Sequence, residues 1–190
     1  MTNGYLFREY IGAQFTGVQF SDVPINAFVS FHFILSFAID YTPVNQQNPP
    51  VPTNGVFTPF WDTANLSPSA VAAIMAVHRT APDGAEEDHA MAHDVDRAVR
   101  GSDGPELLPA AVEQFYDQQS ANYPGGKVLA SFKTGDTTGL ISPDLGISAA
   151  QELQRQNKLL GLFIWSADSS KKSSYGFKYE TDAQQIIANH

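Results

Sequence analysis

Residues 28–41 read FVSFHFILSFAIDY and contain the most apolar run of the chain. The apolar run from Phe28 to Ile39 spans 12 residues and contains His32, whereas a membrane-spanning helix needs about 20 apolar residues. A short run that is apolar on both faces and rich in aromatic side chains is typical of a strand covered on both sides. The stretch therefore predicts a buried strand over Phe28–Tyr41.

Three further segments have the composition of strands, namely Glu9–Phe15, Lys127–Phe132 and Leu159–Ser166. Apolar spacing and capping signals predict helices between and after the strands: one begins at Ser67-Pro68, one carries Val112, Phe115 and Tyr116, one opens at Ser148 with Gln151 three residues on, and one covers Thr181–Ala188. Strands that alternate with amphipathic helices are typical of an α/β domain with a parallel sheet.

The composition narrows the classes of function. With 190 residues the chain suffices for one domain, but it is shorter than the roughly 250 residues of a typical (β/α)8 barrel. Eleven basic and 20 acidic residues give a net charge of −9, which argues against nucleic acid or an anionic membrane as the main partner. The chain has no cysteine, and its first five residues lack the basic start of a secretion signal, so a cytoplasmic location is expected.

One segment differs in character from the rest of the chain. Residues 79–110 hold eight of the 20 acidic residues and no aromatic residue. Their spacing predicts no strand, and it allows a polar helix over Glu86–Arg100 with Met91, Val95 and Val99 as its apolar side. We expect a single domain over residues 1–190 in which residues 79–111 form an acidic insert or junction.

The same segment contains a pair of histidines four residues apart. On a helix His89 and His93 would turn toward one side, with Glu86 or Asp96 near them, as in some zinc sites. The sequence lacks the H-E-x-x-H pattern, and a solvated acidic helix gives a metal no rigid scaffold. We therefore expect no metal and no cofactor.

Five segments of the chain resemble the narbonin-type, chitinase-like branch of family 18 of the glycoside hydrolases, which is a plant branch. They read FREYIGAQF from Phe7, SDVPIN from Ser21, FHFILSFAIDY from Phe31, GGKVL from Gly125 and GLFIWSAD from Gly161. The likeness covers residues 4–78 and 112–190. The first and last of these segments are the most specific.

The resemblance implies a (β/α)8 barrel of the chitinase type. Under this likeness the four predicted strands correspond to the first, second, seventh and eighth strands of the barrel, and strands three to six have no counterpart. Residues 79–111 stand where roughly a hundred residues of barrel would be expected. The fold implied is an incomplete barrel, a half-barrel with the strand order 7-8-1-2.

The family's chemistry is carried by a D-x-x-D-x-D-x-E signature at the end of the fourth strand, where the glutamic acid protonates the glycosidic oxygen. Two places in this chain partly match the signature. Ile39-Asp40-Tyr41 lies in the second strand and lacks the glutamate, and Asp94-Val95-Asp96 has Ala98 in the position of the general acid. A general acid must lie within hydrogen-bond reach of the leaving oxygen, so we expect no catalytic residue.

What the resemblance retains is part of a sugar-binding floor. Trp165 matches the tryptophan that ends the eighth strand, on which the family stacks a sugar ring. Tyr10 and Phe37 match aromatic positions at the ends of the first and second strands. An aromatic face suits a pyranose because the sugar's axial C–H groups are apolar and slightly positive. The alternative is that all three rings belong to the core.

Three hypotheses follow. The first is a catalytically inactive, narbonin-like protein that binds a chitooligosaccharide or another glycan weakly or has a storage role. The second is a shortened form of a family 18 glycosidase in which residues 79–111 mark a splice junction, a shifted reading frame or a gene-model error. The third is an oligomeric interaction protein, because a half-barrel leaves two sheet edges and an apolar face through which copies could associate.

Overall fold

The computed structural model describes residues 4–42, 49, 51–70, 91–94, 108–122, 128–136 and 140–189. Its elements in chain order are β1 (Leu6–Ile11), the 3-10 helix η1 (Phe20–Asp22), β2 (Ser30–Leu35), β3 (Ala38–Ile39), β4 (Thr58–Pro59), β5 (Met91–Asp94), α3 (Leu108–Asn122), β6 (Val128–Lys133), α4 (Pro143–Arg155), β7 (Gly161–Trp165), α5 (Ala167–Lys172) and α6 (Lys178–Ala188).

Five strands form one sheet in the order β2-β1-β7-β6-β5, and every pairing between neighbours is parallel. Strand β1 lies between β2, with Leu6 opposite Ser30, and β7, with Leu6 opposite Gly161. The α/β fold with a parallel sheet predicted from the sequence is confirmed. The four predicted strands also lie in the expected order, since β6, β7, β1 and β2 are consecutive neighbours.

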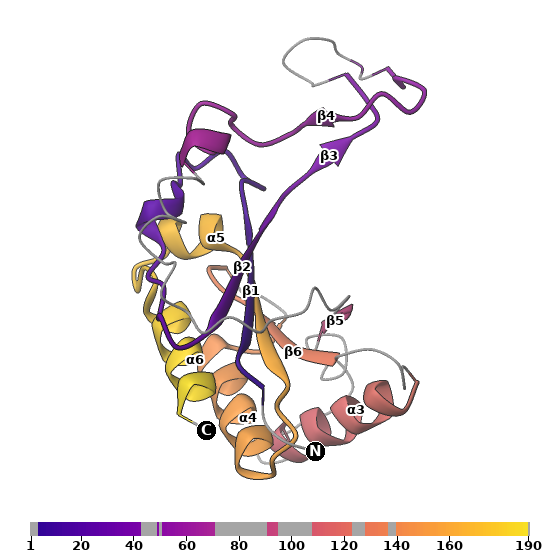
Figure 1. The fold of residues 1–190 in the computed structure, drawn as a ribbon. Coiled ribbons are helices and arrows are strands. Elements are labelled where there is room, and N and C mark those ends of the chain that lie inside the picture. Colours follow the sequence, from indigo (N-terminus) through magenta and orange to yellow (C-terminus); the bar gives the residue numbers. More distant parts are fainter. Residues whose placement is uncertain are drawn as a thin grey trace.

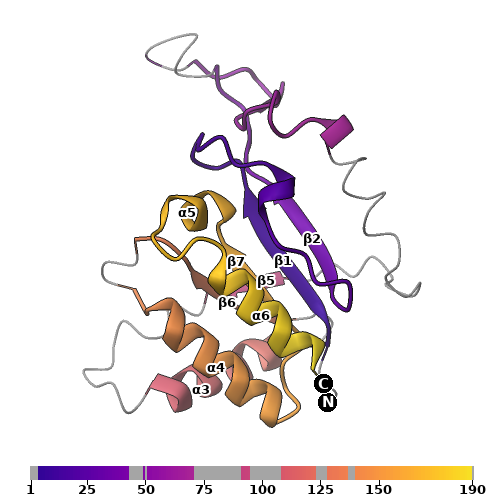
Figure 2. The same ribbon diagram turned by 90° about the vertical axis from the view of Figure 1, so that its left-hand side faces the viewer.

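The helices α4, α5 and α6 lie on one face of the sheet (Figures 1 and 2). The main core fills the space between this face and the helices. Phe7, Leu162 and Ile164 from the strands pack with Leu153 of α4 and Ile187 of α6, and all five are at most 1% exposed. Because side chains alternate along a strand, the residues between these strand positions point to the other face of the sheet.

The third and fourth strands of the chain lie outside the five-stranded sheet. β3 pairs with β4 in an antiparallel ladder, and this hairpin projects from the carboxyl end of β2 (Figure 1). The single strand predicted over Phe28–Tyr41 is thus divided. Its ladder with β1 ends at Ser36, whose N–H donates to Ile11 O, because β1 itself ends there.

Two predicted boundaries differ from the observed ones, and a local feature of the chain explains each difference. The first strand ends at Ile11 and not at Phe15, because Gly12 adopts a φ of +95° that turns the chain out of the sheet. Helix α4 begins at Pro143, five residues before Ser148. Ser142 is its N-cap, and its hydroxyl accepts from Leu145 N–H at 3.3 Å.

Other boundaries agree closely with the prediction. Residues 68–70 are helical and Ser67 caps them, accepting from Ala70 N–H at 3.2 Å. The predicted helix around Tyr116 is α3, and the closing helix begins three residues earlier than expected, at Lys178.

The acidic segment contains a strand that the sequence analysis did not predict. Met91–Asp94 forms β5 and pairs in parallel with β6, from Met91 opposite Val128 to Asp94 opposite Ser131. The helix expected over Glu86–Arg100 is therefore wrong for these four residues, because strand pairing with β6 prevails over the weak helical spacing. Apart from β5 and the start of α3, the segment 79–111 lies outside the described residues.

Candidate carbohydrate site

The carboxyl ends of three neighbouring strands bring three aromatic rings together. Tyr10 lies near the end of β1, Phe37 follows β2 by two residues, and Trp165 is the last residue of β7. The ring centroids of Tyr10 and Trp165 are 4.8 Å apart, those of Tyr10 and Phe37 6.1 Å. Those of Phe37 and Trp165 are 5.7 Å apart, with ring planes 27° from parallel. These are contact distances for aromatic pairs, so the three residues singled out in the sequence form one group, the ring cluster.

The ring cluster lies on the sheet face away from the helices. Tyr10 alternates along β1 with buried residues, and Phe37 is 41% exposed. Phe163, two residues before Trp165 on β7, packs edge-on against Tyr10 at 5.1 Å and supports the cluster from within the sheet. Phe163 was not predicted as part of the site, although the period of two along a strand places it on the same face as Trp165.

Main-chain hydrogen bonds fix the backbone at two of the rings. The bond from Ser36 N–H to Ile11 O is 3.0 Å long and joins the end of β1 to the residue before Phe37. Thr134 N–H donates to Trp165 O at 2.7 Å. The peptide bonds Ser36–Phe37 and Trp165–Ser166 are both cis. Two of the three rings thus stand on backbone that is tied to a neighbouring strand.

Asp168, in the first turn of α5, ties down the loop after β1. Its carboxylate accepts from Gly12 N–H at 2.7 Å and Ala13 N–H at 3.1 Å through Oδ2, and from Gln14 N–H at 3.4 Å and the Thr16 hydroxyl at 2.9 Å through Oδ1. Asp168 has no exposed surface, so these bonds replace its hydration. We call residues 12–16 the anchored loop. Because Asp168 lies three residues after Trp165, one strand end positions both this loop and a ring of the cluster.

Two buried carboxyl groups lie on the helix side of β1. Glu9 and Glu180, the latter from α6, are both 0% exposed. Burial, and then the charge of Glu180, raise the pKa of Glu9 well above its ordinary value of 4.5. Burial also raises the pKa of Glu180, against a hydrogen bond from the Ser170 hydroxyl. Although a raised pKa suits a general acid, neither group has surface that a sugar could reach.

Asp40, the carboxylate of the partial motif in the second strand, has the opposite character. Its Oδ1 accepts from the Thr53 hydroxyl at 2.6 Å and from Gly55 N–H at 2.8 Å. These bonds lower the pKa of Asp40 from its ordinary 3.8, so the group is ionised at neutral pH. A general acid of a glycosidase must hold a proton, and Asp40 holds none under these conditions.

The other partial motif is placed differently from the expectation. Asp94 is the last residue of β5, so the prediction that Asp94-Val95-Asp96 follows no strand is wrong. A strand end is where the family's signature stands. The residue in the general-acid position is nevertheless Ala98, which has no ionisable group. Residues 95–98 lie outside the described part of the chain.

The helix expected to carry the histidine pair is wrong at His93. His93 belongs to the strand β5, and His89 lies outside the described residues. Within the described ranges no three acidic or histidine side chains come together as metal ligands. In the same ranges no helix has the length and apolar character to cross a membrane.

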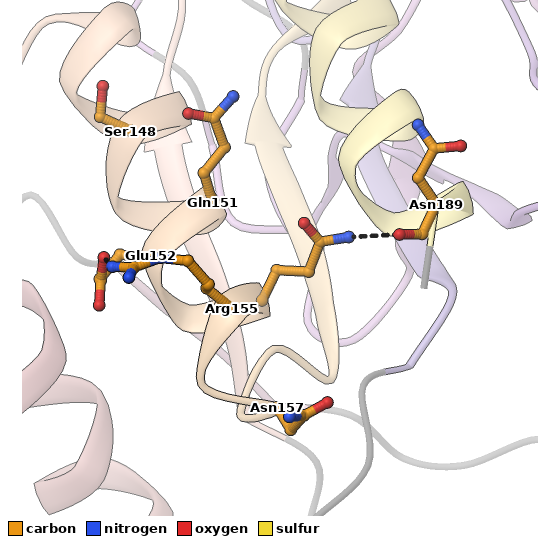
Figure 3. Close-up of a pocket in the computed structure, with 7 residues that line it drawn as sticks. Ser148, Gln151, Glu152, Arg155, Asn157 and Asn189 are labelled. Atoms are coloured by element: carbon orange, nitrogen blue, oxygen red, sulfur yellow. Dashed lines mark hydrogen bonds and ion pairs between the residues drawn. The ribbon is translucent and has the colours of Figure 1, made fainter.

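A polar pocket lies between α4 and the end of α6 (Figure 3). Gln151 of α4 points to the side of the helix that faces α6, whereas Arg155 turns away from Asn189 toward Glu152. The Gln154 amide donates to the carbonyl of Asn189 at 3.1 Å. Asn157 also lines the pocket, and it precedes the first residue of β7 by four positions. The pocket is therefore at the amino ends of the strands, opposite the ring cluster. In parallel α/β folds ligands bind at the carboxyl ends, so we assign the site to the ring cluster.

The fold and the ring cluster together define a parallel α/β protein of the kind that binds ligands at the carboxyl ends of its strands. Comparison with models of protein families gives no match. The chain is similar to "Chitinase 1" of Tulipa saxatilis subsp. bakeri, with 34% identity over an alignment of 283 residues. The alignment covers all of this chain and 89% of the tulip protein.

Two solved structures have a similar fold. The catalytic domain of a family GH18 chitinase from the fern Peteris ryukyuensis matches with a TM-score of 0.77 and 29% identity, over 97% of this chain and 100% of the fern domain. A family 18 chitinase from Crocus vernus matches with a TM-score of 0.73 and 25% identity, over the same shares. The chain belongs to family 18 of the glycoside hydrolases, as a chitinase-like protein related to those of plants.

Proposed function

We propose that this protein binds chitooligosaccharides without hydrolysing them. The observation that carries the proposal is the ring cluster, in which Tyr10, Phe37 and Trp165 meet at the carboxyl ends of β1, β2 and β7. Aromatic faces attract the apolar C–H side of a pyranose. The relatives are named as chitinases, so a chain of N-acetylglucosamine units is the natural ligand class to test.

The absence of hydrolysis is proposed from the acidic residues that the structure describes. Asp40 has a lowered pKa and is ionised, while Glu9 and Glu180 are buried on the other face of β1. Under the partial match of the signature at Asp94-Val95-Asp96, the residue in the general-acid position would be Ala98. The narbonin-like, inactive character and the half-barrel expected from the sequence belong to this proposal.

The binding part is tested by titrating chitooligosaccharides into the wild-type protein and into Trp165→Ala by calorimetry. We expect Trp165→Ala to lose about tenfold or more in affinity, since a stacked aromatic ring contributes about 1 kcal/mol or more beyond its buried area. Phe28→Ala is the control, because Phe28 is 77% exposed and precedes β2 at the other end of the sheet.

Two outcomes would contradict the proposal. If wild type and Trp165→Ala are equally without binding, the ring cluster is no sugar site. If the wild type releases shorter sugars from a chitooligosaccharide, the protein is an enzyme, and its general acid must then be sought by substitution of each acidic residue.

A second candidate, a shortened form of an active glycosidase, is favoured by one observation. The alignment with the tulip chitinase runs over 283 residues, whereas this chain has 190. The relative therefore has residues for which this chain has no counterpart. Sequencing the transcript across the codons of residues 79–111 distinguishes the two candidates, because a longer transcript that encodes the acidic signature would make this chain the shortened product.

A further inference from the structure

The anchored loop presents one aromatic side chain to solvent. Phe15 is 59% exposed, and its backbone has a φ of +51°. A bulky residue with positive φ is uncommon, because its Cβ crowds the neighbouring carbonyl. The hydrogen bonds from Gln14 N–H and the Thr16 hydroxyl to Asp168 hold the chain on both sides of Phe15. The exposed ring is thus held in one place by a buried carboxylate.

A second ring supports Phe15 and connects it to the ring cluster. Phe60 lies just after β4, and its ring centroid is 4.9 Å from that of Phe15 with the planes at 72°. Phe60 N–H donates to Phe37 O at 2.6 Å. Phe60 is therefore the backbone neighbour of one ring of the cluster and the ring neighbour of Phe15.

The anchored loop is also closely packed against the segment that carries Phe60. A Cβ atom on Gly12 would lie 2.6 Å from Trp61 Cβ and 2.9 Å from a methyl group of Leu66, so only glycine allows this approach. The close packing leaves the loop little room to move. Two loops that are far apart in the sequence thus form one rigid support for the exposed ring.

We propose that Phe15, supported by Phe60, is a second stacking platform for a chitooligosaccharide that already occupies the ring cluster. The inference rests on the proposed function. It extends the site from one sugar position at the ring cluster to a row of aromatic rings that continues to Phe15 in the anchored loop. Because the ring is held before the ligand arrives, little conformational freedom is lost on binding. A short sugar fills the ring cluster alone, and a longer one reaches Phe15.

An exposed phenylalanine could also contact a second protein. Continuity with the ring cluster favours the sugar, because the rings of Trp165 and Phe37 stack on each other and the main-chain bond from Phe60 to Phe37 leads on to Phe15. The experiment below also tests for contact with a second protein, by measuring the molar mass by light scattering.

The test compares affinities for N,N′-diacetylchitobiose and chitohexaose by calorimetry. The variants are Phe15→Gly, Phe15→Tyr and the control Phe28→Ala. Phe15→Gly removes the ring and suits the positive φ, so the variant is expected to fold, which circular dichroism and thermal unfolding check. We expect it to weaken chitohexaose binding about three- to tenfold and to leave the disaccharide unchanged. Phe15→Tyr keeps an aromatic face and should bind chitohexaose as the wild type does.

The outcomes separate this inference from the proposed function. If neither sugar binds the wild type, the proposed function fails and the platform fails with it. If the wild type binds both sugars and Phe15→Gly binds chitohexaose equally well, only the platform is wrong. Equal losses for both sugars would place Phe15 in the ring cluster and overturn the second position. A change in molar mass by light scattering without a change in binding would assign Phe15 to a protein contact.

Discussion

At the level of single residues, Glu9 lies in an environment that disfavours a charged carboxylate. It is 0% exposed, its partner from α6 is another carboxyl group, and Asp168 adds a further negative charge. A folded-state pKa above the unfolded value means that the folded protein holds a proton that the unfolded chain has released. Stability from this group is present below pH 4.5 and is lost as the pH rises through the raised pKa.

We therefore expect the free energy of unfolding of the wild type to decline, relative to that of Glu9→Gln, as the pH rises above 4.5. The limit for one proton is about 1.4 kcal/mol per pH unit. The measurement is urea unfolding of both proteins at four pH values. The pKa values of Asp22 and Asp40 are lowered from 3.8, so these groups change the free energy of unfolding only at lower pH and not in the range measured here. Parallel curves for the two proteins would show that Glu9 does not hold the proton.

At the level of elements, α5 depends on a contact with the loop after β1 that spans most of the chain. The bond from Gly12 N–H to Asp168 joins residues 156 positions apart. Asp168→Asn replaces one accepting oxygen by an N–H2 group, which faces main-chain donors and cannot accept from them. The variant leaves buried donors without a partner, and each such loss costs about 1–3 kcal/mol.

For Asp168→Asn we expect a loss of about 1–3 kcal/mol in the free energy of unfolding, measured in urea. Asp182→Asn is the matched control. Asp182 pairs with Lys178 at 2.6 Å on the surface of α6, and an exposed helix pair of this spacing contributes about 0.3–0.5 kcal/mol. Equal effects of the two substitutions would mean that the anchored loop does not depend on Asp168.

At the level of the whole molecule, the described sheet has helices on one face and two strands, β2 and β5, at its edges (Figure 2). Strand edges offer unpaired N–H and C=O groups to another chain. Apolar side chains are also exposed near the projecting hairpin, where Val56 and Phe57 are each 65% exposed. We therefore propose that copies of the protein associate through these sheet edges and exposed apolar side chains.

We expect the molar mass of the protein in solution to rise with concentration above that of the 20.7 kDa chain. Light scattering coupled to size-exclusion chromatography measures this at several loading concentrations. A mass that stays at that of one chain throughout would mean that the edges and the open face are protected within the monomer.

How far the sequence predicted the structure depends on whether a feature is local. The strands around Phe31 and Ile164 follow from continuous apolar runs, and the meeting of Tyr10, Phe37 and Trp165 follows because parallel strands end at one edge. β5 was missed because Met91–Asp94 is short and pairs only through β6. The roles of Asp168 and Glu9 were missed because their environments come from segments about 150 residues away, for which the local pattern has no signal.

The position of β1 in the sheet has a consequence for how the protein is made. β1 leaves the ribosome long before one of its two neighbours, β7, where Leu6 pairs with Gly161. During synthesis β1 can pair with β2 early, but its other edge and the donors of the anchored loop have no partner until β7 and α5 have emerged. Contacts of such long sequence separation form slowly. One edge of the apolar strand β1 is therefore exposed until β7 has been synthesised, and we expect the nascent chain to bind chaperones that recognise hydrophobic segments.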